Sequence, residues 1–402
     1  MPSRLVFVAA FFAVAAPPLA GCQATSPAGA PLLGVPESRP AAFVDVHVVT
    51  MTGSAPLLHQ TVLVRDGRIV TVGSVNDVPV PPDVLQIDGL GRRWLVPGLA
   101  DMHVHVFDRE EFVLHLANGI TTVRNLAGYP LHLAWRDSLV RGLFPGPRLV
   151  TAGRILDGDP PTRSTNFVVL TPEGATAEVS RQAVAGYDFI KVYDNISPAV
   201  YTAIVAEATR HGLSVVGHLP TPVGLTAALG SGGQREIEHL EELLPLFDDG
   251  RSEQGLDSIA LAIAAAGVVV TPTMVVFQSA LDQSLDWAAV RGRAEMRFVS
   301  PETRRTWGWE EAGGSRSGNA QAIARYTRTT QFFYARMLPA LHRAGVCVLA
   351  GSDAPIPALI PGFALYDELR LFERSGIPPL EVLRIATAGA ADALGLGARR
   401  GR

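Results

Sequence analysis

The sequence has 402 residues, of which 48% are hydrophobic and 18% are charged, and its formal net charge is −4. This length allows one large domain with an appendage, or two domains, and the apolar fraction provides enough material for a sizeable core. The slightly negative charge argues against a nucleic-acid partner, which would require a basic face.

The first forty residues are typical of an export signal followed by a tether. Arg4 gives a positive start, and residues 5–20 are apolar but too short and too interrupted by proline for a membrane span. Residues 19–22 end in Gly21-Cys22 and resemble a bacterial lipobox, which implies a signal peptide over 1–21, lipidation of Cys22 and a lipoprotein in the periplasm or on the cell surface. An ordinary signal peptide with a chance cysteine is the alternative. Residues 22–40 are rich in Ala, Pro, Ser and Gly and predict a tether.

Residues 41–95 predict a small β-module ahead of the main domain. The runs 44–49, 60–65 and 68–72 are rich in β-branched residues. An Asp66-Gly67 pair separates the last two runs and is a strong hairpin signal.

From residue 96 to 396 the pattern alternates between apolar strands and helical stretches. Eight strands are predicted, over residues 96–105, 120–126, 147–152, 188–193, 213–218, 235–240, 267–275 and 345–352. Eight strands alternating with helices favour a (β/α)₈ TIM-like barrel over an open doubly wound sheet. No glycine-rich phosphate loop follows any of these strands, which weakens the nucleotide-binding alternative.

Polar side chains occur where the predicted strands end, which is where barrel enzymes carry their functional groups. His103 and His105 are two residues apart, so in a strand both imidazoles face the same side and form half of a metal site. The later strand ends add further candidates: Lys191, His218, His239 and Asp353.

With these residues the chain resembles the metal-dependent amidohydrolase superfamily, in the branch of imidazolonepropionase-like hydrolases and Xaa-Pro dipeptidases. The resemblance covers about residues 43–396. The matching pieces are residues 97–105, 119–124, 189–191, 217–218, 237–239 and 350–353. These motifs are specific for the superfamily and say little about the substrate.

The resemblance implies a centre of two divalent metal ions, usually zinc. His103 and His105 would hold one ion, and His218 and His239 the other. A carboxylated Lys191 would bridge both ions together with a hydroxide, and carboxylation would turn a costly buried ammonium into an anion. Asp353 would bind the first ion and act as base and then as acid.

Three further residues are candidates for substrate binding. Tyr193 shares the strand face of Lys191 and would contact the substrate or the oxyanion. Arg124, at the end of the second strand, would pair with a substrate carboxylate, and a structural ion pair is an equally good interpretation. Arg154 follows the third strand at the barrel mouth, where many dipeptidases of the family have Gly-Gly-His instead.

The C-terminus also differs from the pattern of the family, as the region around Arg154 does. Relatives continue into strands that complete the N-terminal β-sandwich module, whereas this sequence stops at Arg402. We therefore expect a module that lacks its C-terminal strands and has a poorly covered sheet edge.

Together these features predict a lipid-anchored metallohydrolase that cleaves an amide-type C–N bond of a small molecule. A dipeptide, an N-acyl amino acid and a cyclic amide all fit. An ester or lactone hydrolase with the same centre is the nearest alternative, and a non-catalytic metal-bound binding lipoprotein is another. We expect membrane contact only through the N-terminal anchor, and a homo-oligomer is compatible with the sequence.

Overall fold

The computed structural model describes residues 39–53, 55–230, 233–247, 253–308 and 318–402. The predicted signal peptide, nearly all of the predicted tether and the predicted lipidation site Cys22 lie outside these ranges. None of the helices within them combines the length and the hydropathy that a membrane span requires.

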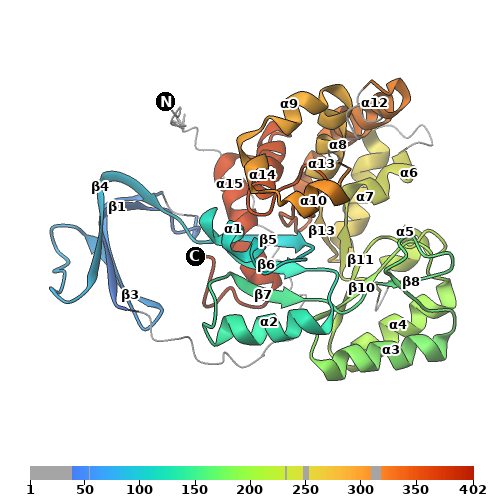
Figure 1. Ribbon diagram of the computed structural model, residues 1–402, viewed down its shortest axis with the longest axis horizontal. Helices are drawn as coiled ribbons and strands as arrows, with labels where there is room; N and C mark the ends of the chain where they lie inside the picture. The colour runs from blue at the N-terminus through green and yellow to red at the C-terminus, as the bar shows by residue number, and fades with distance from the viewer. Residues whose placement is uncertain (1–38, 54, 231–232, 248–252, 309–317) are drawn as a thin grey trace.

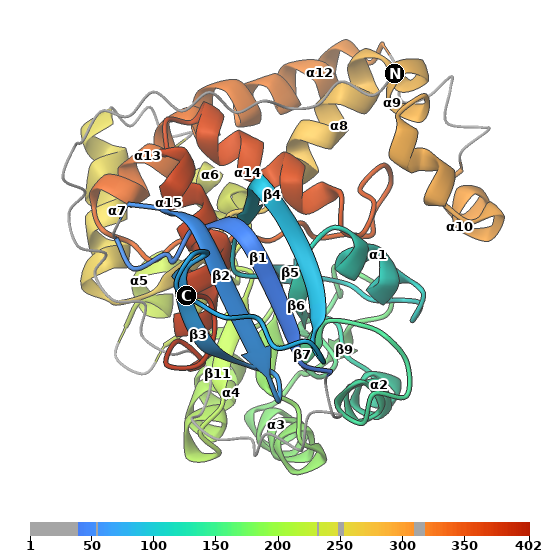
Figure 2. The same cartoon turned by 90° about the vertical axis from the view of Figure 1, so that its left-hand side faces the viewer.

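Strands β1 to β4 form one four-stranded sheet, in the order β3-β2-β1-β4. Their bounds are Ala41–Val48, Leu57–Arg65, Arg68–Ser74 and Leu85–Leu95. The predicted hairpin is confirmed: Arg65 pairs with Arg68, and the two turn residues between them have positive φ, as an Asp-Gly turn favours. In Figure 1 this sheet stands to one side of the remaining chain, and Figure 2 looks onto it. A second layer, as a sandwich requires, is not found among the described residues, so the sandwich and its missing C-terminal strands stay predictions.

The remainder of the chain folds as a TIM-like barrel. Seven of its strands are regular: β5 Leu99–Val104, β6 Ile120–Asn125, β7 Arg148–Thr151, β10 Phe189–Val192, β11 Ser214–Gly217, β12 Glu236–Glu238 and β13 Val269–Thr271. Wherever two neighbouring strands of this set are joined by regular hydrogen bonds, they run parallel. Each of the seven lies within a predicted strand and is shorter than predicted. Two short strands, β8 Leu156–Asp157 and β9 Phe167–Val168, were not predicted and extend the edge of β10.

The predicted eighth strand is an extended segment and not a regular strand. On one side Leu349 N donates to Val270 O on β13 at 2.9 Å. On the other side Met102 N, on β5, donates to Ala350 O at 2.9 Å. A parallel bridge between Ala152 and Phe189 joins β7 to β10. The ring of strands therefore closes, and the first and eighth strand ends become neighbours.

Helices alternate with the strands and cover the barrel (Figure 1). The larger ones are α2 Pro130–Val140, α3 Pro172–Ala185, α4 Pro198–Arg210, α7 Glu253–Ala265, α8 Val275–Leu285, α13 Ala335–Arg343 and α14 Ala364–Arg374. The shorter ones are α1 Glu111–Ala117, α5 Gly224–Ala228, α6 Leu244–Phe247, α9 Trp287–Arg291, α10 Pro301–Thr306, α12 Ala320–Thr327, α15 Pro379–Arg384 and α16 Ala390–Ala393. Single turns of 3₁₀ and π-helix extend them: Leu240–Leu243, Ala294–Phe298, Arg328–Tyr334 and Ile385–Gly389.

Local sequence explains where the helices begin. The hydroxyl of Ser197 accepts from Val200 N ahead of α4, and Thr171 caps α3 in the same way. Proline follows each cap, at the first helical position, where no amide hydrogen is needed.

Gly351 sets the spacing between the eighth strand segment and β5. A Cβ at this position would lie 2.6 Å from His103 Cβ and 2.7 Å from Thr271 Cγ2. We expect Gly351→Ala to lower the free energy of unfolding by about 1–3 kcal/mol, because the added methyl overpacks a closed barrel wall. Urea unfolding followed by circular dichroism measures this. Gly174→Ala is the control, since a Cβ there meets nothing closer than 3.4 Å; equal losses in both variants would contradict the account.

Candidate metal centre

The first and eighth strand ends bring three of the predicted ligands into contact. Asp353 Oδ1 lies 3.2 Å from His103 Nε2 and 2.8 Å from His105 Nε2. The two imidazole rings are 5.3 Å apart, so both face the same side of β5, as their spacing predicts.

Ring contacts connect the other predicted ligands to this group. The ring of His239 lies 4.6 Å from that of His103 and 4.6 Å from that of His218. Tyr193 stacks on His218 at 3.7 Å, and Lys191 Nζ lies 5.8 Å from the Tyr193 ring centre. The six predicted ligands and Tyr193 therefore meet at one end of the barrel.

Four buried atoms of this group make no well-directed hydrogen bond within the described residues: His103 Nε2, Lys191 Nζ, His218 Nε2 and Asp353 Oδ1. His103 Nε2 and Asp353 Oδ1 face each other as an ion pair at 3.2 Å, whereas Lys191 Nζ and His218 Nε2 have no partner among the described residues. Buried polar atoms are nearly always hydrogen-bonded, so these atoms indicate that another group satisfies them. Imidazole nitrogens with carboxylate oxygens are a donor set suited to zinc and similar divalent ions. The residues present therefore fit a metal centre.

One candidate site mixes the two predicted ligand pairs. Ligand atoms of His103, His239 and Asp353 all lie within 4.8 Å of one another. The sequence interpretation assigned His103 and His239 to different ions, so two ions here would have to be close neighbours. Lys191 lies beside this group, and its burial lowers the pKa of its ammonium.

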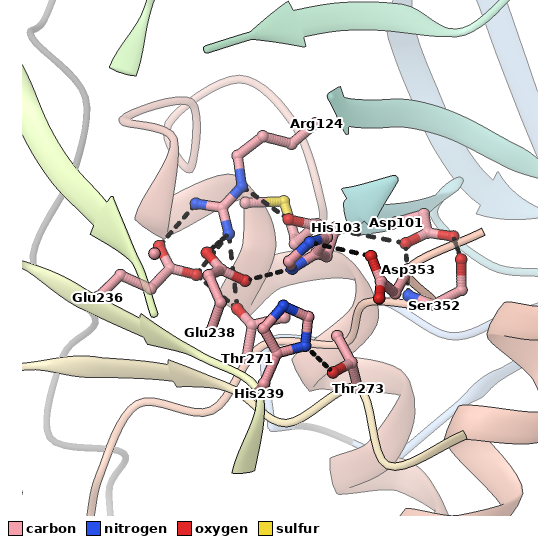
Figure 3. Close-up of polar contacts among 12 residues, drawn as sticks. Asp101, His103, Arg124, Glu236, Glu238, His239, Thr271, Thr273, Ser352 and Asp353 are labelled. Carbon is pink, nitrogen blue, oxygen red and sulfur yellow. Dashed lines mark hydrogen bonds and ion pairs between the residues drawn. The ribbon is translucent and has the colours of Figure 1, made fainter. Parts of the chain in front are cut away.

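A charge network under the centre holds His103 (Figure 3). Glu238 Oε2 lies 2.7 Å from His103 Nδ1, and Arg124 Nη2 donates to Glu238 Oε1 at 2.8 Å. Burial disfavours the charge of Glu238, but Arg124 and His103 outweigh it and lower its pKa to about 2. Because an ionised carboxylate only accepts, His103 Nδ1 must carry the proton, which leaves Nε2 as the lone-pair donor.

Arg124 therefore forms a structural ion pair inside the barrel and does not face a substrate carboxylate at the barrel mouth. Its guanidinium is fully buried and donates to Met102 O at 2.7 Å and to Glu236 Oε2 at 2.6 Å. With Glu238 as a third partner and no exposed surface, it has no face that a substrate can reach. Of the two interpretations of Arg124, the ion pair describes the structure.

Arg154 does not contact the cluster either. Its Nη2 donates to Thr165 O at 3.2 Å, and its guanidinium lies over the Phe167 ring at 5.1 Å. These contacts brace the loop between β8 and β9 and direct the side chain toward that loop.

His218 and His239 are oriented by partners on their Nδ1 atoms. His218 Nδ1 lies 2.6 Å from Asp194 Oδ1 and 3.1 Å from Glu242 Oε1. Burial alone would lower the pKa of His218, but these two carboxylates raise it to about 9. His239 Nδ1 lies 2.7 Å from Thr273 Oγ1. In each case Nδ1 is occupied, so Nε2 would be the metal ligand, and a bound ion would displace any proton on it.

Asp353 is aimed by a strained turn. Its φ is +56°, which non-glycine residues seldom adopt. Asp353 N donates to His103 O at 2.7 Å, and the hydroxyl of Ser352 donates to Asp101 Oδ2 at 2.6 Å. These bonds stabilise the turn that presents the Asp353 carboxylate to the histidines (Figure 3).

Sequence analysis did not identify these supporting residues. The sequence could have pointed to Glu236 and Glu238, because two glutamates on one face of an apolar strand need a buried partner. Asp194, Glu242 and Thr273 follow strands and Asp101 lies within β5, and no pattern in the sequence indicated their contacts. Their roles depend on contacts between residues far apart in the chain.

Glu238 and Glu236 form a matched pair for testing this network. Both carboxylates are fully buried and bind Arg124, but only Glu238 contacts His103. We expect Glu238→Gln to weaken zinc affinity by about 10- to 100-fold, and Glu236→Gln to leave it nearly unchanged while destabilising the fold to a similar degree. Competition with a chromophoric chelator measures the affinity. An equal loss in both variants would mean that Glu238 acts only through general stability.

Comparison with known proteins agrees with this geometry. The sequence profile of the Amidohydrolase family matches residues 94–402. The imidazolonepropionase of Aromatoleum aromaticum is 41% identical over 68 residues, which are 16% of this chain and 16% of that protein. Only a small part of that curated relative is therefore matched.

Solved structures share the fold over most of the chain. A bottromycin amidohydrolase is 24% identical, with a TM-score of 0.72 over 93% of this chain and 84% of its own. A putative prolidase from Bifidobacterium longum is 22% identical, with a TM-score of 0.66 and coverages of 91% and 86%. A Xaa-Pro dipeptidase with bound methionine is 19% identical, with a TM-score of 0.63 and 90% of each chain covered.

The chain belongs to the amidohydrolase family, a class of hydrolases that act on carbon–nitrogen bonds. This confirms the family that the strand-end motifs predicted.

Proposed function

We propose that this protein hydrolyses an amide-type C–N bond of a small molecule at a centre of two divalent metal ions. The observation that carries the proposal is the meeting of six potential ligands at one end of the barrel, where the buried Lys191 Nζ and His218 Nε2 have no partner among the described residues. A purely structural cluster would leave no reason for these two atoms to lack partners.

The residues that would hold the ions are His103, His105, Lys191, His218, His239 and Asp353. Lys191 would bridge the ions as a carbamate, since its side chain is fully buried and its Nζ has no hydrogen-bond partner among the described residues. We propose zinc because imidazole and carboxylate donors suit it. When bound, the ions would lower the pKa of a water molecule and polarise the scissile carbonyl.

The chain's own groups would manage the protons and the oxyanion. Asp353 would accept the proton of the attacking water and return it to the leaving nitrogen, because its carboxylate faces the ligand cluster directly. Burial raises the pKa of Tyr193 to about 12, so its hydroxyl keeps its proton and would donate to the oxyanion.

The proposal also covers the class of substrate and the cellular location of the protein. Relatives bearing the names imidazolonepropionase, prolidase and Xaa-Pro dipeptidase favour dipeptides, N-acyl amino acids or cyclic amides. The lipobox-like sequence before Cys22 supports export and a lipid anchor in the periplasm or on the cell surface.

A substrate panel tests the activity. Cys22→Ser protein, which cannot be lipidated at that thiol, is assayed on Xaa-Pro dipeptides, N-acyl amino acids, cyclic amides, and the matched esters and lactones. We expect amide cleavage that a chelator abolishes and zinc restores. Cleavage of esters and lactones alone would support the ester-hydrolase alternative, and ligand binding without turnover of any member would support the binding lipoprotein.

A further inference from the structure

One buried glutamine amide joins the ends of two strands that carry candidate ligands. Gln234 is 2% exposed, and its Nε2 donates to Gly217 O at 2.8 Å and to His218 O at 3.1 Å. The same Nε2 donates to Glu236 O at 2.8 Å. Gly217 ends β11 just before His218, and Glu236 begins β12, which leads to His239. A single side chain therefore ties together the backbones that present two of the six candidate ligands.

Strand β11 leaves regular strand geometry where this amide binds it. Gly217 has a φ of +139°, and a Cβ at this position would lie 2.2 Å from Val192 O. His218 N donates to Val192 O at 3.1 Å, so β10 holds one side of the histidine's backbone. On the other side, the pairing of β11 with β12 ends where Gly217 lies opposite Ile237. The hydrogen bond from Gln234 holds the His218 carbonyl beyond this point.

Neighbouring helices fix Gln234 itself. Its backbone N donates to Ala228 O, in α5, and to the hydroxyl of Tyr201, in α4, both at 3.0 Å. The preceding residue, Gly233, packs so closely that a Cβ would lie 2.1 Å from Ala228 O. The orientation of the side-chain amide is also determined, because the opposite orientation would place Oε1 against three carbonyl oxygens.

The amide is costly at this position. Gln234 Oε1 is buried and has no hydrogen-bond partner among the described residues, and an unpaired buried acceptor lowers stability. An apolar side chain of the same length would avoid that cost but would offer no donor to the three carbonyls. What distinguishes Gln234 from an apolar residue here is therefore its N–H groups, which hold the backbone around His218.

We propose that Gln234 is a positioning residue for the metal ion that His218 would hold. Asp194 and Glu242 orient the imidazole through Nδ1, and Gln234 fixes the backbone from which this imidazole projects. Partners that orient a metal ligand in this way contribute to metal affinity although they do not touch the ion. The inference rests on the proposed two-metal function.

The other side of the centre has separate support. His103 and His105 lie on β5, whose backbone is held by the eighth segment: His105 N donates to Ala354 O at 2.7 Å, and Asp353 N donates to His103 O at 2.7 Å. The hydrogen bonds of the Gln234 amide all go to β11, His218 and β12. Loss of this amide should therefore affect the two ions unequally.

Zinc titration of metal-free protein tests the inference. Gln234→Met keeps the length of the side chain and removes its N–H groups. We expect the wild-type protein to bind two ions, and Gln234→Met to bind one of them about 10- to 100-fold more weakly while the other affinity stays nearly unchanged. Calorimetry with a competing chelator measures both affinities, and His218→Ala, which removes a candidate ligand, identifies the ion that this histidine would hold.

Gln182 provides a matched control. It is also a fully buried glutamine, its Nε2 donates to Arg154 O at 3.0 Å, and its Oε1 has no partner among the described residues. Its amide makes its hydrogen bonds to Arg154 and Glu178, and not to β11 or β12. Gln182→Met should lower the thermal unfolding temperature much as Gln234→Met does, but both zinc affinities should remain those of the wild type.

The inference is overturned if Gln234→Met weakens both ions equally or neither, or if Gln182→Met reproduces its effect on zinc. If Gln234→Met does not fold, Gln234→Asn replaces it, because this amide is one methylene shorter and should lose the contact with His218 O; unchanged zinc affinities in that variant overturn the inference as well. A wild-type protein that binds fewer than two ions overturns the proposed two-metal function, and this inference with it, before any variant is compared. Two ions in the wild type with no selective effect in the variants overturn the role of Gln234 alone.

Discussion

Lys191→Ala should lose most of its bound metal and at least about 1,000-fold of its hydrolytic activity, because the variant removes the proposed bridge between two ions. The fold itself should survive. The amine is fully buried, has no hydrogen-bond partner among the described residues and has a pKa lowered by burial, so its removal relieves a desolvation cost. Metal analysis and thermal unfolding of the metal-free protein measure the two effects separately.

Lys191 is the only lysine in the sequence, since all other residues counted as Lys or Arg are arginine. Any lysine carbamate formed from isotope-labelled bicarbonate must therefore arise at this residue, and a single carbamate signal in carbon NMR would report it. Short carboxylic acids should partly restore metal binding to Lys191→Ala by taking the place of the lost bridge. Unchanged metal content in the variant would contradict the bridging assignment.

Asp353→Asn should retain much of the metal but lose about 100- to 10,000-fold in kcat, the usual contribution of a positioned proton-transfer group. The side-chain amide of the variant keeps one oxygen as a potential metal ligand, but it cannot accept a proton as the carboxylate does. Its near-isosteric shape should also preserve the turn at φ +56° that Ser352 and Asp101 support. Steady-state kinetics with metal analysis of the same sample distinguish the two roles.

Ser352→Ala tests how much the position of the Asp353 carboxylate matters. The variant keeps this carboxylate but removes the hydroxyl that donates to Asp101 and stabilises the turn. A moderate loss of kcat with intact metal is expected. If Asp353→Asn lost metal completely, with activity falling only in proportion, Asp353 would be a ligand without a proton-transfer role.

The barrel and the convergence of the candidate ligands could be predicted because both depend on local patterns. Apolar runs with helical stretches between them predict a strand order. In a parallel barrel that order alone brings residues such as His103, His218 and His239 to one end. The eighth segment was predicted as a regular strand over 345–352, but its hydrogen bonds are irregular, and the turn at Asp353 follows it directly.

The partners of those ligands could not be predicted, because they depend on which distant side chains meet. Arg124 at the end of a strand could face the mouth or the interior, and only the contacts with Glu236 and Glu238, more than one hundred residues away, distinguish the two.

Metal analysis of the purified Cys22→Ser protein tests the central claim most directly. The account predicts about two divalent ions per chain, loss of amide hydrolysis on chelation and recovery with zinc. Full amide hydrolysis by a metal-free protein, or a protein that takes up no divalent ion when the ions are supplied, would contradict it.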